Sequence, residues 1–105
     1  MRKGDEIMGK YLLLWQLDPA RIPVDPKERG AGWAALLEMV KKDLEKGILK
    51  NWGSFVAESK GFGIMEGDET EIATNLQRYA PYVGFETHSF MSASEVEKMI
   101  KALAG

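Results

Sequence analysis

The chain has 105 residues, of which 45% are hydrophobic and 29% charged, a profile typical of one globular domain. Its formal net charge of -2 gives no basic surface for nucleic acid, and no run approaches the roughly 20 apolar residues that span a bilayer. The absence of cysteine excludes disulfides, thiolate nucleophiles and Cys-ligated metals, and it fits the reducing cytoplasm, where we expect the protein.

The first residues are polar and glycine-containing, so we expect a flexible leader over 1–9 and a single domain over 10–105. Tyr11 to Leu17 is a short apolar run that ends at Asp18-Pro19. Its length and its boundary predict a strand that is buried on both faces.

A helix is predicted to begin after a loop with three prolines. Asp25 can cap it, with Pro26 at the first helical position and Glu28 placed to complete a capping box. Gly47 supplies the left-handed conformation that ends such a helix. Apolar residues at helical spacing form its inward stripe: Trp33, Leu36, Leu37, Val40 and Leu44.

Two strands joined by a hairpin are predicted next. Ile48 to Glu58 forms the second strand, Ser59-Lys60-Gly61 the turn, and Phe62 to Glu66 the third strand. Gly61-Phe62-Gly63 resembles only the start of a dinucleotide loop and opens no helix. It therefore indicates a close backbone approach within the hairpin.

The strand and helix pattern then repeats. Asp68 and Glu71 form a capping box for a helix that stops before Pro81, and Val83 to Met91 forms a fourth strand. The inward residues of that helix are Ile72, Leu76 and Tyr79. Ser92 and Glu95 cap a tail helix with the stripe Val96, Met99, Ile100 and Leu103. The order predicts an α+β, ferredoxin-like βαββαβ domain with a four-stranded antiparallel sheet and a C-terminal helix.

The strands are apolar on both faces, which predicts a homodimer. Both helices of a βαββαβ domain lie on one side of its sheet, so a monomer should have a polar second face. The first strand instead carries Leu13, Trp15 and Leu17 on one side and Leu12 and Leu14 on the other. Packing against an identical partner with two-fold symmetry would cover this second apolar face.

Three segments resemble the dimeric α/β-barrel superfamily of ferredoxin-like proteins: residues 47–53, Tyr79-Ala80-Pro81-Tyr82 and Phe85-Glu86-Thr87-His88. That superfamily includes muconolactone-isomerase-like proteins, antibiotic-biosynthesis monooxygenases without a cofactor, and haem-degrading monooxygenases. The resemblance runs from about residue 9 to 103 and is closest to a small branch with no agreed activity. It implies two helix-covered sheets that face each other, with pockets either between sheet and helices or inside the barrel. The Asn, Trp and His of the haem-degrading relatives stand at other positions, so that activity is not transferred.

His88, the only histidine, is predicted to share a strand face with Glu86. The pair could act as general base or acid toward a small carbonyl compound, or it could be a hydrogen-bonded contact at the dimer seam. A single histidine without cysteine predicts no metal site, and no cofactor is expected. Arg21, Lys27, Arg29 and Arg78 are scattered along the chain and predict no anion clamp.

Aromatic residues are the candidates for a ligand-binding wall. Trp15 and Trp52 could line a pocket with the hydroxyl of Tyr11, although core packing is the favoured explanation of the two tryptophans. Asn51 is a polar candidate, but it points away from Trp52 unless a bulge intervenes. The sequence therefore predicts a dimeric protein that binds a small organic molecule, either as a binding protein or as a cofactor-free isomerase or monooxygenase, with a non-catalytic structural or regulatory dimer as the alternative.

Overall fold

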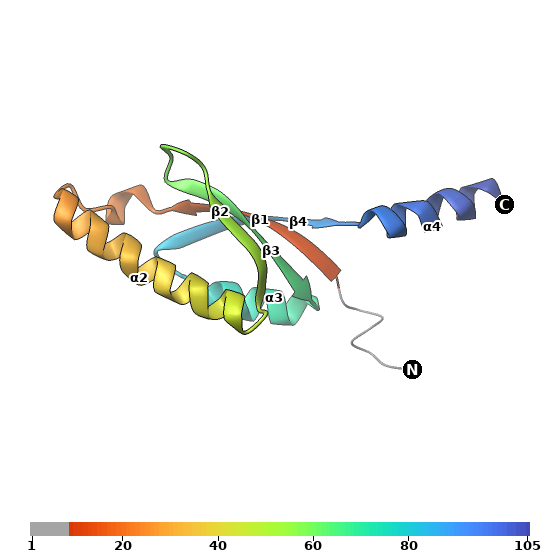
Figure 1. The fold of residues 1–105 in the computed structure, drawn as a ribbon, viewed down its shortest axis with the longest axis horizontal. Helices are drawn as coiled ribbons and strands as arrows, with labels where there is room; N and C mark the ends of the chain where they lie inside the picture. Colours follow the sequence, from red (N-terminus) through yellow and green to blue (C-terminus); the bar gives the residue numbers. More distant parts are fainter. Residues whose placement is uncertain (1–8) are drawn as a thin grey trace.

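The computed structural model describes residues 9–105, in which three α-helices accompany a four-stranded antiparallel sheet (Figure 1). The elements in chain order are β1 (Gly9–Leu17), the short 3-10 helix η1 (Pro19–Arg21), α2 (Pro26–Glu45), β2 (Leu49–Ser54), β3 (Lys60–Gly67), α3 (Glu69–Gln77), β4 (Val83–Phe90) and α4 (Ala93–Ala104). The predicted α+β class and the four-stranded antiparallel sheet are confirmed. The predicted leader lies outside the described residues except for Gly9, which belongs to β1.

The sheet has the strand order β2-β3-β1-β4, with β1 and β3 at its centre. β1 pairs with β3 through Leu12 and Ile64, and with β4 through Leu12 and His88. The register between β2 and β3 shifts between Leu49 and Asn51, where β2 contains a bulge. Cross-strand partners share a face, so these registers decide which side chains lie together.

The helix caps follow the sequence signals closely. Asp68 with Glu71, and Ser92 with Glu95, form the two predicted capping boxes. At the start of α2, only the Asp25 half of the predicted box is formed among the described residues, with Glu28 N–H donating to its carboxylate at 3.1 Å. Gly47 has a φ of 78° directly after α2, as predicted.

The predicted hairpin turn at Ser59-Lys60-Gly61 is wrong. β2 ends at Ser54, and β3 already begins at Lys60, so the turn occupies 55–59 and holds Ala57 at a φ of 63°. Phe55 N–H donates to Lys60 C=O at 2.9 Å and closes this turn. Gly61 is therefore a strand residue, and the glycine serves a close contact rather than a turn.

The hydrophobic core lies between one face of the sheet and the helices α2 and α3, which lie on the same side of the sheet in Figure 1. Its buried residues are Leu13, Trp15, Val40, Leu49, Met65, Ile72, Tyr79 and Val83. Two residues of the predicted α2 stripe are exposed, Leu37 at 43% and Leu44 at 38%. They lie beside the sheet-facing row that Trp33, Leu36 and Val40 form, and the next inward position in that row is Asp43.

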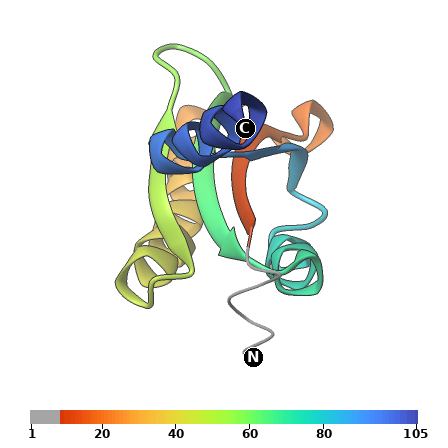
Figure 2. The ribbon, with the colours of Figure 1, turned by 90° about the vertical axis from the view of Figure 1, so that its right-hand side faces the viewer.

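The C-terminal helix α4 leaves the body of the molecule instead of packing on it. It projects from the end of β4 in Figures 1 and 2 and contributes to a longest dimension of 60 Å, against 27 and 22 Å for the other two. None of its residues is buried. Among residues 9–105, no helix combines the length and the apolar character needed to cross a membrane.

Candidate functional site

The sheet face opposite α2 and α3, here called the open face, has an apolar centre. Leu12 and Leu14 of β1 pair there with Ile64 and Phe62 of β3, and all four side chains are only partly buried. The ring of Phe55 stacks on Phe62 with centroids 6.4 Å apart and extends the apolar area. The prediction that β1 is apolar on both faces is confirmed, and this face is left without a helix over it.

His88 and Glu86 lie side by side on the open face, along the edge strand β4. The register pairs His88 with Leu12 and Glu86 with Leu14, so both point to the same side as the apolar centre. The Nε2 atom of His88 is 2.6 Å from Oε2 of Glu86, a hydrogen bond between two solvent-exposed side chains. The structure thus brings together the two residues that the sequence analysis proposes as an acid/base pair.

A wide hollow of about 670 Å³ lies at the end of the open face and reaches Glu86, whereas His88 lies outside its lining. Leu14, Phe55, Lys60 and Glu86 contribute to its lining, and Trp15 borders it. The hollow is shallow and open to solvent, and it offers an apolar floor with charged groups at the margin. Such a combination is usual for small-molecule sites, provided that something closes the opening.

The predicted aromatic wall lies on the opposite side of the sheet from His88. Trp15 is 3% exposed and stacks on Trp52 with ring centroids 5.3 Å apart, while Trp33 meets it edge-on at 6.1 Å. Its indole N–H donates to the C=O groups of Gly53 and Phe62, at 3.2 Å each. The space beside the Trp15 and Trp52 rings measures only about 20 Å³, room for roughly one water.

The remaining predicted ligand residues are divided between the two faces. Tyr11 is partly buried and packs against the core on the helix side. Asn51 pairs with Ile64 on the open face, where its side-chain oxygen accepts from Trp52 N–H at 2.8 Å. The open face therefore carries His88 and Glu86 on the edge strand β4 and Asn51 on the opposite edge strand β2, whereas Trp15, Trp52 and Tyr11 belong to the other side.

A buried polar cluster that the sequence analysis misses lies between α2 and the end of α3. Asp43 is 1% exposed, and its carboxylate accepts from Tyr79 O–H at 2.7 Å and from the guanidinium of Arg78 at 2.5 Å. Burial, followed by the hydrogen bond to Asp43, raises the pKa of the Tyr79 hydroxyl far above its usual 10.0. Tyr79 therefore remains a donor, and the cluster joins the two helices.

A second cleft, of about 340 Å³, opens between η1, the first half of α2 and the segment that leads from α3 into β4. Arg21, Arg29 and Arg78 all line it, although Arg78 lies far from the other two in the sequence. Their separation along the chain conceals this grouping. Periodicity could have indicated only that Arg29 and Trp33, four residues apart, share one side of α2.

Among residues 9–105, no group of three or more His, Asp or Glu side chains is placed to hold a metal ion. Comparison with known protein families, with curated proteins and with solved structures gives no match. What the chain does must therefore be argued from its own residues.

Proposed function

We propose that two copies of the chain pack through their open faces, as ferredoxin-like domains of a dimeric α/β barrel, and bind a small organic molecule in the space between the sheets. The element order β-α-β-β-α-β, with α2 and α3 on one side of the sheet, supports this assembly. The hollow of about 670 Å³ beside Glu86 carries the proposal, because a second sheet across it would convert an open depression into a chamber.

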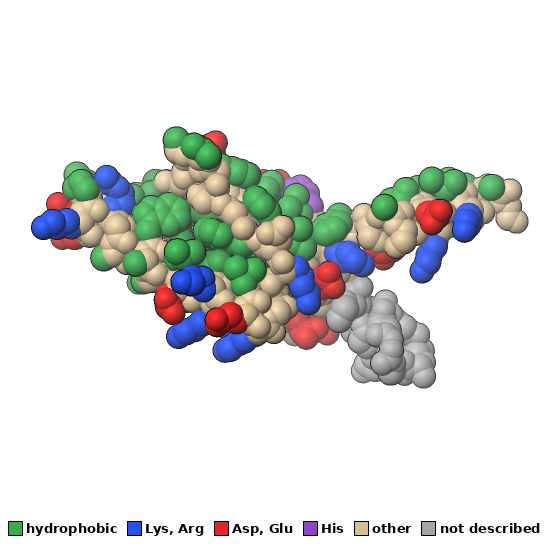
Figure 3. All heavy atoms as spheres, in the orientation of Figure 1, with side chains coloured by type: hydrophobic (Ala, Val, Ile, Leu, Met, Phe, Trp, Pro, Cys, Tyr) green, Lys and Arg blue, Asp and Glu red, His purple; other side chains and the backbone are tan. Residues whose placement is uncertain are grey.

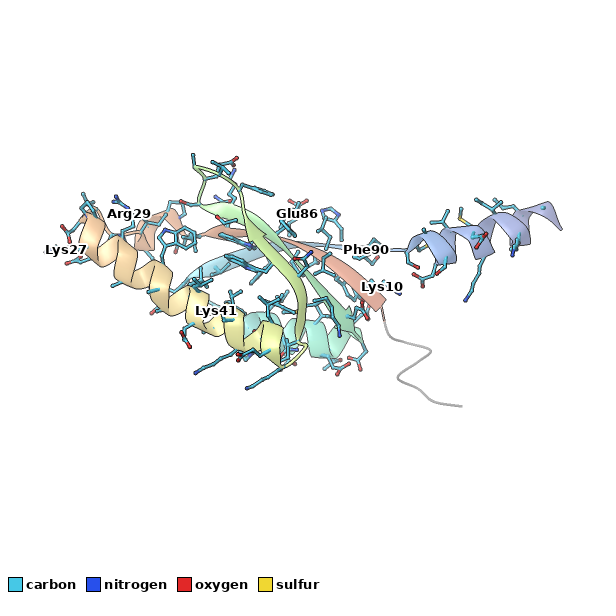
Figure 4. The ribbon with its side chains drawn as sticks, in the orientation of Figure 1. Lys10, Lys27, Arg29, Lys41, Glu86 and Phe90 are labelled. Carbon is cyan, nitrogen blue, oxygen red and sulfur yellow. The ribbon has the colours of Figure 1, made fainter. Side chains whose placement is uncertain are left out.

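Self-association suits the chemistry of the open face. Its centre is apolar, and its margin carries charges of both signs: Lys10, Lys60, Glu66 and Glu86. A two-fold contact brings this surface against a copy of itself, so the two apolar centres meet. Because the margin carries both signs, positive side chains of one copy can lie near negative side chains of the other. Figure 4 labels Lys10, Glu86 and Phe90 around this side of the sheet.

The His88 and Glu86 pair gives the chamber a group that can move a proton. An imidazole that is held by a carboxylate at 2.6 Å can accept a proton from a carbon acid and return it elsewhere. That chemistry is sufficient for an isomerase, or for a monooxygenase whose substrate anion reacts with oxygen directly. In both cases the proposed substrate is a small carbonyl compound.

A non-catalytic dimer is the second candidate. Trp15 and Trp52 are occupied in packing, which removes two aromatic residues from any site on the open face. His88 and Glu86 are both exposed and would then serve as a contact at the dimer seam. This structural or regulatory role needs the same assembly but no ligand.

Native mass spectrometry of Leu14→Glu tests the assembly. A carboxylate in the centre of the open face should convert a wild-type dimer to monomer, because burying it without a partner is strongly unfavourable. Leu37→Glu is the matched control, since it places the same charge on an exposed leucine of α2 and should leave the dimer intact. A wild-type monomer, or equal masses for both variants, would contradict the proposal.

The same spectra separate the two candidates. A dimer that carries extra non-covalent mass, lost in His88→Ala while the dimer persists, supports the ligand chamber. Weakening of the dimer by His88→Ala without any ligand mass supports the seam contact. Identification of the bound mass would then supply the substrate for measurements of turnover, which should fall by a factor of about 10² or more in His88→Ala.

A further inference from the structure

We propose that the cleft of about 340 Å³ on the helix side of the molecule binds an amphipathic organic acid, with an apolar body inside and a carboxylate at the arginine-lined mouth. This second site adjoins the hollow of about 670 Å³, since Leu17, Asp18 and Val83 line both, but its remaining walls come from η1, α2 and the segment before β4. It belongs to a single copy of the chain and does not depend on the dimer.

The interior of the cleft is apolar. Its walls come from one end of the sheet, where Leu17 pairs with Val83, from the loop after η1 and from the inward side of α2: Leu17, Ile22, Trp33, Leu36, Met39 and Val83. The volume lies within the range of small-molecule sites, and the walls offer few polar groups to a sugar or a nucleotide. They therefore favour an aliphatic or aromatic body that leaves water for an apolar surface.

The loop that closes one side of the cleft is held in place at both of its ends. Asp18 N–H donates to Tyr82 C=O at 2.9 Å, which ties the start of η1 to the segment before β4. At the other end, Arg29 donates from α2 to the C=O groups of Pro23 and Val24, at 3.3 and 2.8 Å. A loop fixed in this way keeps the cleft open without a ligand, which lowers the entropic cost of binding.

In the described part of the chain, the charged residues that line the cleft are three arginines and one aspartate, Asp18, so positive charge predominates there. Arg21, Arg29 and Arg78 reach it from three different segments, and Figure 4 shows Arg29 near the beginning of α2. The guanidinium of Arg78 already binds Asp43, and Arg21 lies 3.3 Å from Asp18 and over the ring of Tyr82 at 5.4 Å. A guanidinium has five donors, so Arg21, which is about half exposed, retains N–H groups for an incoming carboxylate.

Titration with octanoate and with octanol tests the inference, because the two share an apolar chain and differ in charge. The resonance of the Trp33 indole N–H is the reporter, since Trp33 lines the cleft. We expect octanoate to shift this resonance saturably and to bind at least about tenfold more tightly than octanol, a difference of about 1.4 kcal/mol. Equal binding of both would overturn the assignment of an acid, and no saturable shift would overturn the site.

Three variants separate the apolar interior from the charged mouth. Arg21→Gln should weaken octanoate about tenfold and leave octanol unchanged, whereas Lys27→Gln removes an equal charge from an exposed position outside the cleft and should change neither. Ala35→Phe places a ring in the lined space and should abolish both. If Arg21→Gln and Lys27→Gln weakened octanoate binding equally, the charge dependence would come from the net charge of the protein, which would contradict a carboxylate site at Arg21.

The outcome is independent of the proposed dimer. Leu14→Glu, which should disrupt the open face, is expected to keep octanoate binding at the cleft. If octanoate binding were instead lost in Leu14→Glu and retained in Ala35→Phe, the ligand would belong to the chamber between the sheets, and the second site would be rejected.

Discussion

At the scale of single residues, Gly61 lies where the backbone of Gly53 and the ring of Trp15 leave no room for a side chain. A Cβ atom on Gly61 would lie 2.1 Å from Gly53 C=O and 2.4 Å from the Trp15 ring. The same indole donates to Gly53 and Phe62, so it is fixed by hydrogen bonds and by stacking on Trp52. Neither the backbone nor the ring can move aside without loss of these contacts.

We therefore expect Gly61→Ala to destabilise the protein by about 1–3 kcal/mol or more, the usual range for overpacking a rigid core. Chemical denaturation with tryptophan fluorescence measures the change. Gly30→Ala is the matched control, because a Cβ at that helical position meets no atom within 4 Å. It should stabilise α2 by about 0.5–1 kcal/mol, and equal effects of the two variants would contradict this account of Gly61.

The burial of Asp43 could not be predicted from the sequence. Asp43 stands in a charged run of α2 that suggests a solvated face, and only the fold brings Tyr79 and Arg78 to its carboxylate. A buried carboxylate is tolerated when its oxygens are fully paired, and its partners lie 35 and 36 positions away in the chain. No local pattern reports such a distant pairing.

At the scale of elements, the sequence patterns that predict helix boundaries correctly are those whose residues lie within one turn of each other. Asp68 with Glu71 and Ser92 with Glu95 bond within one turn, so the sequence alone is enough to place the starts of α3 and α4. The hairpin turn fails because Gly61 has the residue type of a turn but is required in β3 by Trp15, which lies in another strand. The site divides in the same way: His88 and Glu86 are two positions apart and were predictable as a pair, whereas the arginines of the cleft were not.

Glu95 makes the attachment of α4 sensitive to acid. Its hydrogen bond from Ser92 N–H, at 2.8 Å, and then the one from Lys10 Nζ, at 3.2 Å, lower the pKa of this carboxylate from 4.5 to about 2. Because the pKa is lower in the folded chain, the stabilisation is complete above about pH 4.5 and is lost as the pH falls through about 2. We expect the first turn of α4 to fray over this interval.

Amide and side-chain resonances of Ser92 to Val96, followed from pH 6 to 2, measure the fraying. In Glu95→Gln the side chain can still accept from Ser92 N–H but cannot titrate, so the transition should disappear. Glu97→Gln, an exposed change on the same helix, should leave the transition as in the wild type. A persistent transition in Glu95→Gln would assign it to another group.

At the scale of the whole molecule, two apolar surfaces have no partner within the described chain: the open face and the stripe of α4. Figure 3 shows hydrophobic side chains along one side of the projecting α4 and charged ones along the other. Met99, Ile100 and Leu103 are 45%, 56% and 80% exposed. A helix of 12 residues is marginal on its own in water, so its apolar stripe needs a surface to pack on.

We propose that a partner copy supplies that surface in the dimer, because α4 continues the direction of β4 and extends beyond its own body (Figure 1). Ile100→Glu should therefore raise the dimer dissociation constant at least about tenfold, since a charge would enter the contact. Ala102→Glu adds the same charge outside the stripe and should leave the constant unchanged. Sedimentation equilibrium measures both, and equal effects of the two would mean that α4 stays free in the dimer.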